Sequence, residues 1–154
     1  METCGHSTYA LVYGVAMASH HTKDKGDLGV LKAQVDLFEQ GFTVLVPQTE
    51  HCPFDLVAYG DGRFERVQVK YRAMDKFGKL GVKFSTCWTD KRGTHTSPVD
   101  KYEVDLYCIY CPDTVECYYL RPEKFGSNAS LRVKAPKNGQ LKRVNFAADH
   151  RRVP

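Results

Sequence analysis

The chain has 154 residues, of which 42% are hydrophobic and 26% are charged, and its formal net charge at pH 7 is +4. This length suits a single domain with one core, and the composition excludes disordered and fibrous proteins. No apolar run approaches the roughly 20 residues of a membrane-spanning helix, so we expect no membrane contact and a cytoplasmic protein.

The first residues, 1–21, contain an apolar run that ends in Ala16-Met17-Ala18 and imitates a signal-peptide cleavage site. No Lys or Arg precedes the run, although a secretory segment needs a basic start. We therefore expect a flexible leader at 1–21, which is either uncleaved or precedes a true start at Met17, and one domain at 22–154. The six cysteines are then expected to be reduced thiols.

A helical pattern covers residues 24–40 and stops at Gly41, a residue typical of the position after a helix. At about 100° per residue, one stripe of large apolar side chains is expected to face the core: Leu28, Leu31, Val35 and Phe38, widened by Val30 and Leu37. Asp27 falls inside this stripe. It either forms a capping box with Asp24 or is a carboxylate aimed at a functional site.

After a short strand expected at 43–46, a β-hairpin is predicted from two apolar runs, 54–59 and 64–71. They are joined by Gly60-Asp61-Gly62-Arg63, and an Asp-Gly pair between β-prone runs favours a type I′ turn. A side-chain period of two makes Gln68 and Lys70 neighbours on one face of the second strand. Asp55 opens the first strand.

Asp55, Gln68 and Lys70 together form a compact hydrolytic set. Carboxylate and amide oxygens suit a hard cation such as Mg²⁺. A lysine can orient an attacking water or neutralise charge on a phosphate. The alternative is a buried strand pair with Gln68 and Lys70 on a solvated edge.

Pro53-Phe54-Asp55 followed by Gln68-Val69-Lys70 resembles the signature of the PD-(D/E)xK nuclease superfamily, within it the homing endonucleases of bacterial group I introns. The resemblance spans residues 23–120. Gln68 stands where most of the superfamily has Glu or Asp, and the intron-encoded branch tolerates Gln there. The implied fold is α/β and restriction-endonuclease-like: a central mixed β-sheet, an N-terminal helix packed on it, and additional C-terminal β-hairpins.

The same resemblance implies that Asp55, Gln68 and Lys70 are catalytic, with Mg²⁺ held by Asp55 and Gln68. Related nucleases carry a further acid on the first helix, and Asp27 is the candidate for this catalytic and metal-binding role. If that acid belongs one turn later, Val30 stands in its place and the acid has been lost.

The implied function is site-specific, metal-dependent cleavage of double-stranded DNA in intron homing. One site in a 17.5 kDa chain requires a homo-oligomer to cut both strands, and the resemblance favours a tetramer over a dimer. The alternatives are a Holliday-junction resolvase or a restriction-like nuclease. From a different class, the chain is a catalytically decayed DNA-binding module in which Gln68 is the lesion.

Further along, a strand is expected at 80–84, a polar loop at 88–98 and a hairpin at 104–120. The spacing of Cys108 and Cys111, with Cys117 nearby in sequence, suggests a zinc site. A structural zinc normally takes four ligands, however, and no second pair is present. Buried strand cysteines are therefore the better interpretation.

The C-terminal segment 124–154 holds eight Lys or Arg residues and one acid, Asp149. Basic and apolar residues alternate at 131–134 and 141–144 around a turn at 137–139, which predicts a hairpin with one cationic face. Such a face is either a solvated edge or a surface for the DNA backbone. We favour the second, with DNA-binding residues Lys91, Arg92, Arg132, Lys134, Lys142 and Arg143.

Overall fold

The structure is a computed structural model that describes residues 21–49, 51–98, 102–135, 139 and 141–154. Residues 1–20 of the expected leader, and residues 137 and 138 of the expected C-terminal turn, lie outside this part of the chain. The elements in chain order are α1 (His21–Glu39), β1 (Thr43–Leu45), β2 (Leu56–Gly60), β3 (Arg63–Tyr71), β4 (Lys79–Lys83), β5 (Ser85–Asp90), β6 (Gly93–Pro98), β7 (Leu106–Cys111), β8 (Glu116–Leu120), η1 (Pro122–Lys124), β9 (Asn128–Arg132), β10 (Asn145–Phe146) and η2 (Ala147–His150).

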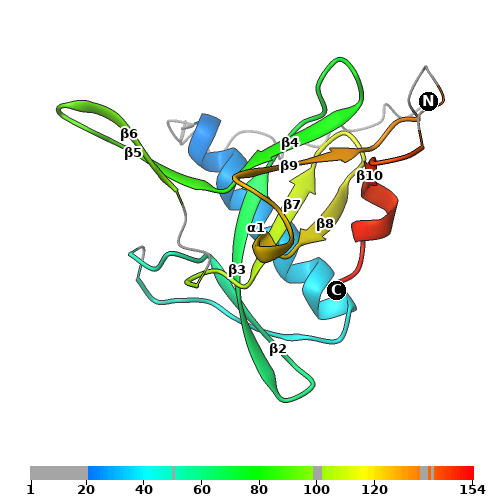
Figure 1. Ribbon diagram of the computed structural model, residues 1–154. Coiled ribbons are helices and arrows are strands. Elements are labelled where there is room, and N and C mark those ends of the chain that lie inside the picture. The colour runs from blue at the N-terminus through cyan, green and yellow to red at the C-terminus, as the bar shows by residue number, and fades with distance from the viewer. Residues whose placement is uncertain (1–20, 50, 99–101, 136–138, 140) are drawn as a thin grey trace, which may run out of the picture.

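A five-stranded sheet in the order β1-β2-β3-β7-β8 forms the centre. β3 and β7 pair in parallel, and the other neighbours are antiparallel. In Figure 1, α1 lies behind this sheet, and β4 with β9, from a second sheet in the order β10-β9-β4, lie in front of it. The expected α/β class, with a mixed central sheet and an N-terminal helix on it, is confirmed.

The β2–β3 hairpin forms as predicted. Gly60 pairs with Arg63, and the two residues between them have positive φ angles, 50° at Asp61 and 74° at Gly62. Positive φ at both central residues is the mark of the type I′ turn, which matches the twist of the flanking strands. The turn therefore sets the register of the strand that carries Gln68 and Lys70.

Helix α1 begins three residues earlier than expected, at His21. Asp24 and Asp27 thus lie inside the helix, and the capping-box interpretation of the pair is wrong because neither is the N-cap. The helix end is as predicted: Gly41 has φ +94°, and its amide N donates to the carbonyl O of Phe38 at 2.9 Å. Within the described residues, no helix has the length and apolar content needed to cross a membrane.

The face of α1 that packs on the sheet holds only part of the expected stripe, since Leu37 is buried and Val30 is half-buried against the core. Ala33 and Leu37 are fully buried, and a Cβ added to Gly29 would lie 3.5 Å from the Cβ of Tyr71 on β3. By contrast, Phe38 of the expected stripe is 73% exposed, and Leu28, Leu31 and Val35 are also exposed. The prediction was wrong for these four residues because periodicity weighs hydrophobicity, whereas the closest helix–sheet contact, at Gly29 and Ala33, selects for small size.

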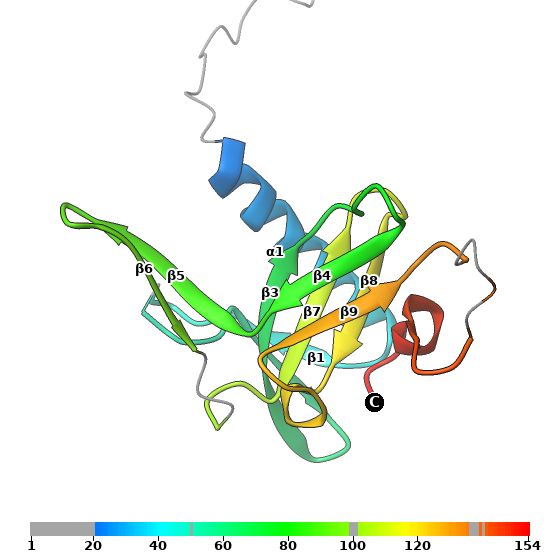
Figure 2. The same cartoon turned by 45° about the horizontal axis from the view of Figure 1, so that its top comes forward.

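Two apolar cores lie on the two faces of the central sheet, because side chains alternate along its strands. One core faces α1 and the other faces the β10-β9-β4 sheet. Figure 2 shows α1 on one side of the central sheet and strands β4 and β9 on the other. Cys108 and Cys117 belong to the first core and Cys111 to the second. All three thiols are free and buried, as predicted for strand cysteines, and they do not converge on one point.

The segment expected as a polar loop at 88–98 is instead most of a two-stranded ribbon, β5–β6. Its pairs run from Ser85 with Pro98 to Asp90 with Gly93, and Figure 1 shows it extending away from the body of the molecule. Lys91 and Arg92 form the exposed turn at its tip. The expectation of a loop was wrong because β5 and β6 pair through their backbones, which a polar composition does not exclude.

The hairpin expected within the C-terminal segment does not form. β9 pairs antiparallel with β4, from Lys79 with Arg132 to Lys83 with Asn128, and β10 pairs in parallel with β9. The alternating pattern correctly indicated a strand with one buried face. It did not identify the partner strand, since alternation describes the faces of a strand and not its edges.

Candidate active site

Asp55, Gln68 and Lys70 meet where β2 begins beside β3. The amide N of Asp55 donates to the carbonyl O of Val67 at 2.9 Å, which holds the residue against β3 one position before β2 starts. Gln68 and Lys70 lie on the face of β3 away from α1, since the intervening Val69 packs in the core on the helix side. The structure thus brings together the three residues that the motif singled out.

Hydrogen bonds fix the carboxylate of Asp55. Its Oδ2 accepts from Nε2 of Gln68 at 2.5 Å and from the amide N of Val69 at 2.6 Å. Only the nitrogen of an amide can donate to a carboxylate, so Gln68 directs Nε2, and not Oε1, at Oδ2 of Asp55. Within the described residues, Oδ1 of Asp55 accepts no hydrogen bond.

Burial raises the pKa of the Asp55 carboxyl above its ordinary value of 3.8. The Val69 amide, the nearby charge of Lys70 and the Gln68 amide oppose this shift without cancelling it. A half-buried carboxylate whose charge is incompletely compensated is a favourable place for a cation. Asp55 Oδ1 and Gln68 Oε1 are both oxygen ligands, which hard divalent cations prefer.

This donor set is sparse. Within the described residues, no cluster of three or more His, Cys, Asp and Glu side chains gathers around a possible metal position. The residues present fit one hard cation held by a carboxylate and an amide oxygen, with water and substrate as its further ligands, an arrangement that Mg²⁺ adopts readily.

Tyr107 is a neighbour of this site that the sequence did not reveal. It is the Cα partner of Gln68 across the parallel β3–β7 pair, it is fully buried, and its hydroxyl has no hydrogen-bond partner within the described residues. Burial raises its pKa to about 12, and the charge of Asp55 adds to the shift. Its place beside Gln68 follows only from the register between two strands that are far apart in sequence.

A second unforeseen feature is a bidentate ion pair between Arg66 and Asp105. Nε and Nη2 of Arg66 donate to the two carboxylate oxygens of Asp105, each at 2.8 Å, and the amide N of Arg66 donates to Oδ2 at 2.8 Å. The Arg66 guanidinium and amide hold the pKa of Asp105 below its ordinary value. The pair ties β3, two residues before Gln68, to the segment that leads into β7.

Asp27 is not brought to this group. Its side chain is exposed on α1, and within the described residues it makes no hydrogen bond or ion pair with Asp55, Gln68 or Lys70. Val30, the alternative position for an acid, is half-buried and packs against the core on the helix side. The catalytic and metal-binding role of Asp27 therefore stays a prediction.

The residues predicted to bind DNA are spread over the molecule. Lys91 and Arg92 are at the ribbon tip, while Arg132 at the end of β9 and Arg143 before β10 line one common cavity. Lys134 and Lys142 are exposed nearby in sequence but do not line it.

Comparison with known proteins gives two matches of high coverage. A family model described as PD-(D/E)XK endonuclease matches residues 20–153, which include Asp55, Gln68 and Lys70. The solved structure of a bacterial homing endonuclease, I-Ssp6803I, is similar at 26% sequence identity and a TM-score of 0.68, over 84% of this chain and 88% of that chain. No curated protein matches.

Proposed function

Because the chain belongs to the PD-(D/E)XK endonuclease family and is a DNA endonuclease, we propose that it is a site-specific, Mg²⁺-dependent homing endonuclease. The observation that carries the proposal is the hydrogen bond from Gln68 to Asp55, with Lys70 on the same strand face. The homing role is supported by the similarity to a bacterial homing endonuclease. Residues 22–154 act in this proposal as one nuclease domain.

Asp55 and Gln68 would hold the metal ion through Oδ1 and Oε1. When bound, Mg²⁺ supplies a more acidic water and stabilises negative charge on the phosphate. Gln68 contributes no charge, so Asp55 alone supplies the negative charge of the pair. Its bonds to Val69 and Gln68 orient the carboxylate before any ligand arrives, which removes the cost of ordering it.

Lys70 acts on the reacting phosphate and the attacking water. Its ammonium group is close enough to lower the pKa of Asp55 by its charge, so it belongs to the same electrostatic unit. A compact positive charge at this place favours the extra negative charge of the phosphate in the transition state, and it can orient a water for attack.

Gln68 also favours a second candidate function, a DNA-binding module whose nuclease site has decayed. A neutral amide in place of a carboxylate weakens metal binding, because one unit of negative charge is missing. The two functions differ in one observable: the decayed module binds DNA but does not cut it with any divalent metal.

We further propose that the working form is a homo-oligomer, a dimer or a tetramer. One site per chain can attack only one strand of a duplex at a time. The exposed apolar side chains of Leu31, Val35 and Phe38 on α1 support this proposal as a surface that a second copy would cover. Light scattering on wild type and Phe38→Ser tests it, and a monomeric wild type at working concentration contradicts it.

The nuclease proposal is tested with a plasmid library of randomised inserts, because the target sequence is unknown. The protein is incubated with the supercoiled library and Mg²⁺, and the linear products are sequenced across their ends. EDTA and Lys70→Ala are the controls. A recurrent cleavage sequence supports a site-specific endonuclease, and a synthetic four-way junction cut in preference to duplex would favour a resolvase. Binding without cleavage in Mg²⁺ or Mn²⁺ would favour the decayed module.

A further inference from the structure

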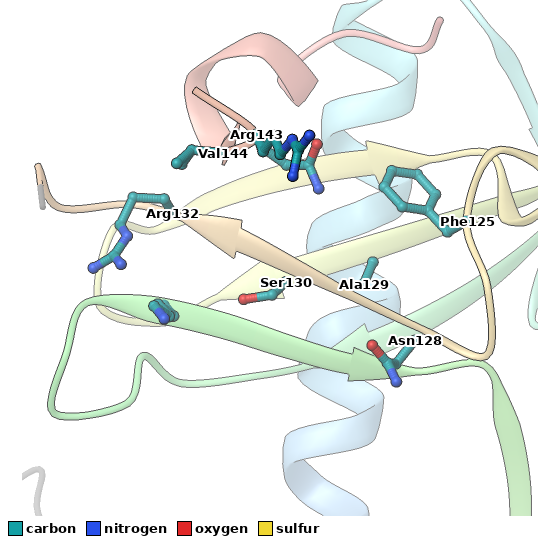
Figure 3. A pocket seen from close by; sticks show the side chains of 9 residues that line it. Phe125, Asn128, Ala129, Ser130, Arg132, Arg143 and Val144 are labelled. Carbon is teal, nitrogen blue, oxygen red and sulfur yellow. The ribbon is translucent and has the colours of Figure 1, made fainter. Parts of the chain in front are cut away.

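The outward face of the β10-β9-β4 sheet carries a cavity of about 360 Å³ (Figure 3). Its lining residues come from β4, β9, β10 and the segments beside them: Lys79, Phe125, Asn128, Ala129, Ser130, Arg132, Arg143, Val144 and Asn145. None of them lies on β2 or β3 or in the loop before Asp55. The cavity is therefore a separate feature from the active site.

The charge of this cavity has one sign. Lys79 and Arg132 are direct partners across β4 and β9, and Arg143 faces them from the segment before β10. Among the described residues, no acidic side chain lines the cavity. Asn128, Ser130 and Asn145 add neutral side chains that can donate hydrogen bonds. Three cations and three neutral donors around one space are suited to an anion with several oxygens.

A carboxylate outside the cavity, that of Asp75, senses the charges of Lys79 and Arg132 but is engaged elsewhere. Asp75, in the turn before β4, accepts from the amide N of Phe77 at 2.8 Å and of Lys79 at 2.9 Å. The hydrogen bond from the Lys79 amide N is the main cause that holds the pKa of Asp75 below its ordinary value. The charges of Lys79 and Arg132 contribute less. Asp75 offsets part of the positive charge from outside the cavity but does not line it.

Arg132 and Arg143 are presented by the backbone in different ways. Nη1 of Arg132 donates to the carbonyl O of Phe77 at 2.9 Å, which holds the guanidinium at the cavity edge. The backbone of Arg143 has φ +57°, which lies in the left-handed region that residues other than Gly, Asn and Asp adopt rarely. Such a conformation costs free energy and is often found where a ligand is held.

From these observations we propose that the cavity is a phosphate-binding site. The phosphate group is bound by Lys79, Arg132 and Arg143, and the apolar sides of Phe125 and Val144 offer contacts for a sugar ring. The source is a phosphodiester of the DNA backbone outside the scissile position or a free phosphate ion. The DNA source rests on the proposed function, since it makes this face part of the substrate-binding surface.

The first arm of the test measures DNA binding by fluorescence anisotropy in EDTA, so that no cleavage occurs. Arg143→Gln and Arg132→Gln each remove one charge from the cavity, and Lys32→Gln removes one from α1 on the other face of the central sheet. The plot of log affinity against log salt concentration has a negative slope, and each lost phosphate contact should reduce the magnitude of that slope by about 0.9. We expect this loss for both cavity variants and no change for Lys32→Gln.

The second arm measures the melting temperature in inorganic phosphate against chloride at equal ionic strength. A ligand that binds only the folded protein raises its stability, and Arg143→Gln should remove that rise. Arg143 makes no hydrogen bond or ion pair within the described residues, so this variant should fold normally. Circular dichroism checks the folding of Arg132→Gln, which loses its bond to Phe77.

The outcomes separate the two sources. A reduced salt slope assigns the site to the DNA backbone, and an unchanged slope with loss of the phosphate-dependent melting shift assigns it to free phosphate. If neither measurement distinguishes the cavity variants from Lys32→Gln, the cavity binds no phosphate and the proposal is overturned. Both arms omit the metal, so they remain informative even if the wild type cleaves nothing.

Discussion

The Asp55–Gln68–Lys70 site and the cavity around Arg132 and Arg143 use charge in opposite ways. The site buries a carboxylate and holds it with hydrogen bonds from one neighbouring strand. The cavity gathers cations from several segments, and Arg143 remains exposed.

This difference reflects two tasks with different electrostatic needs. A reacting phosphate needs charges that are fixed and poorly solvated, because interactions inside a low-dielectric site are stronger. A bound DNA backbone needs accessible cations, whose contribution comes largely from counterion release and is therefore sensitive to salt. Variants in the site should change the cleavage rate, and variants in the cavity should change the salt dependence of binding.

The largest effect is expected from Asp55→Asn. The change keeps a side-chain oxygen that can accept from the Val69 amide, but it removes the negative charge that Asp55 would offer to the metal. Cleavage should fall below detection in a single-turnover assay with Mg²⁺, while DNA affinity in EDTA stays near that of wild type. A variant that still cuts at a rate near wild type would show that Asp55 does not hold the metal.

The same variant should change how stability depends on pH. The folded pKa of Asp55 lies above its ordinary value of 3.8, so the contribution of Asp55 to stability is complete below pH 3.8. That contribution is lost as the pH rises through the folded pKa. Metal-free Asp55→Asn should lack this loss, and melts between about pH 3 and pH 7 measure it. A neutral-pH stability below that of wild type would contradict the burial argument.

Lys70→Ala should come next, with cleavage slower by about 10² to 10³-fold, the usual cost of one group that stabilises transition-state charge. The salt dependence of its DNA binding should match that of wild type, whereas Arg143→Gln should weaken the salt dependence. Lys83→Ala, on exposed β4 surface outside the cavity, is the matched control for loss of one lysine. If Lys70→Ala lowers the salt slope instead of the rate, Lys70 is a backbone contact.

Gln68→Glu should strengthen metal binding by about tenfold or more, because a second negative charge joins Asp55. Calorimetric titration with Mg²⁺ measures the change. Without metal, the same substitution replaces a 2.5 Å hydrogen bond by two carboxylates in contact, so the melting temperature should fall. Unchanged metal affinity would show that the residue at 68 does not face the ion.

Tyr107→Phe tests the buried neighbour of Gln68 on β7 and should raise the free energy of unfolding by about 1 kcal/mol. The hydroxyl of Tyr107 is buried without a partner within the described residues, and removing it removes an unsatisfied polar group. Urea denaturation measures the change. A destabilised variant would mean that the hydroxyl is satisfied in solution, by a water beside Asp55 and Gln68.

The smallest effect is expected from Asp27→Asn, which should cleave at close to the wild-type rate because the Asp27 side chain is exposed and, within the described residues, makes no hydrogen bond or ion pair with the other three. Asp24→Asn, on the same helix, is the matched control. A loss of rate by orders of magnitude in Asp27→Asn alone, with an unchanged melting temperature, would restore Asp27 to the metal site.

The active-site hairpin was predictable because its determinants are local. An Asp-Gly turn sets the register of β2 and β3, and a period of two places Gln68 and Lys70 on one face. The family signature lies within the same stretch and could be read from Asp55 to Lys70. The end of α1 at Gly41 was predictable for the same reason, since a helix stop depends on the residues around it.

Features that depend on distant partners were decided by the tertiary structure. The parallel pairing of β3 with β7 placed Tyr107 beside Gln68, and the pairing of β9 with β4 placed Lys79 opposite Arg132. The close approach of α1 to β3 placed Gly29, Ala33 and Leu37 against the sheet and left Phe38 exposed. Strand edges and packing distances are set by the whole chain, whereas hydrophobic periodicity records only which face of an element is apolar.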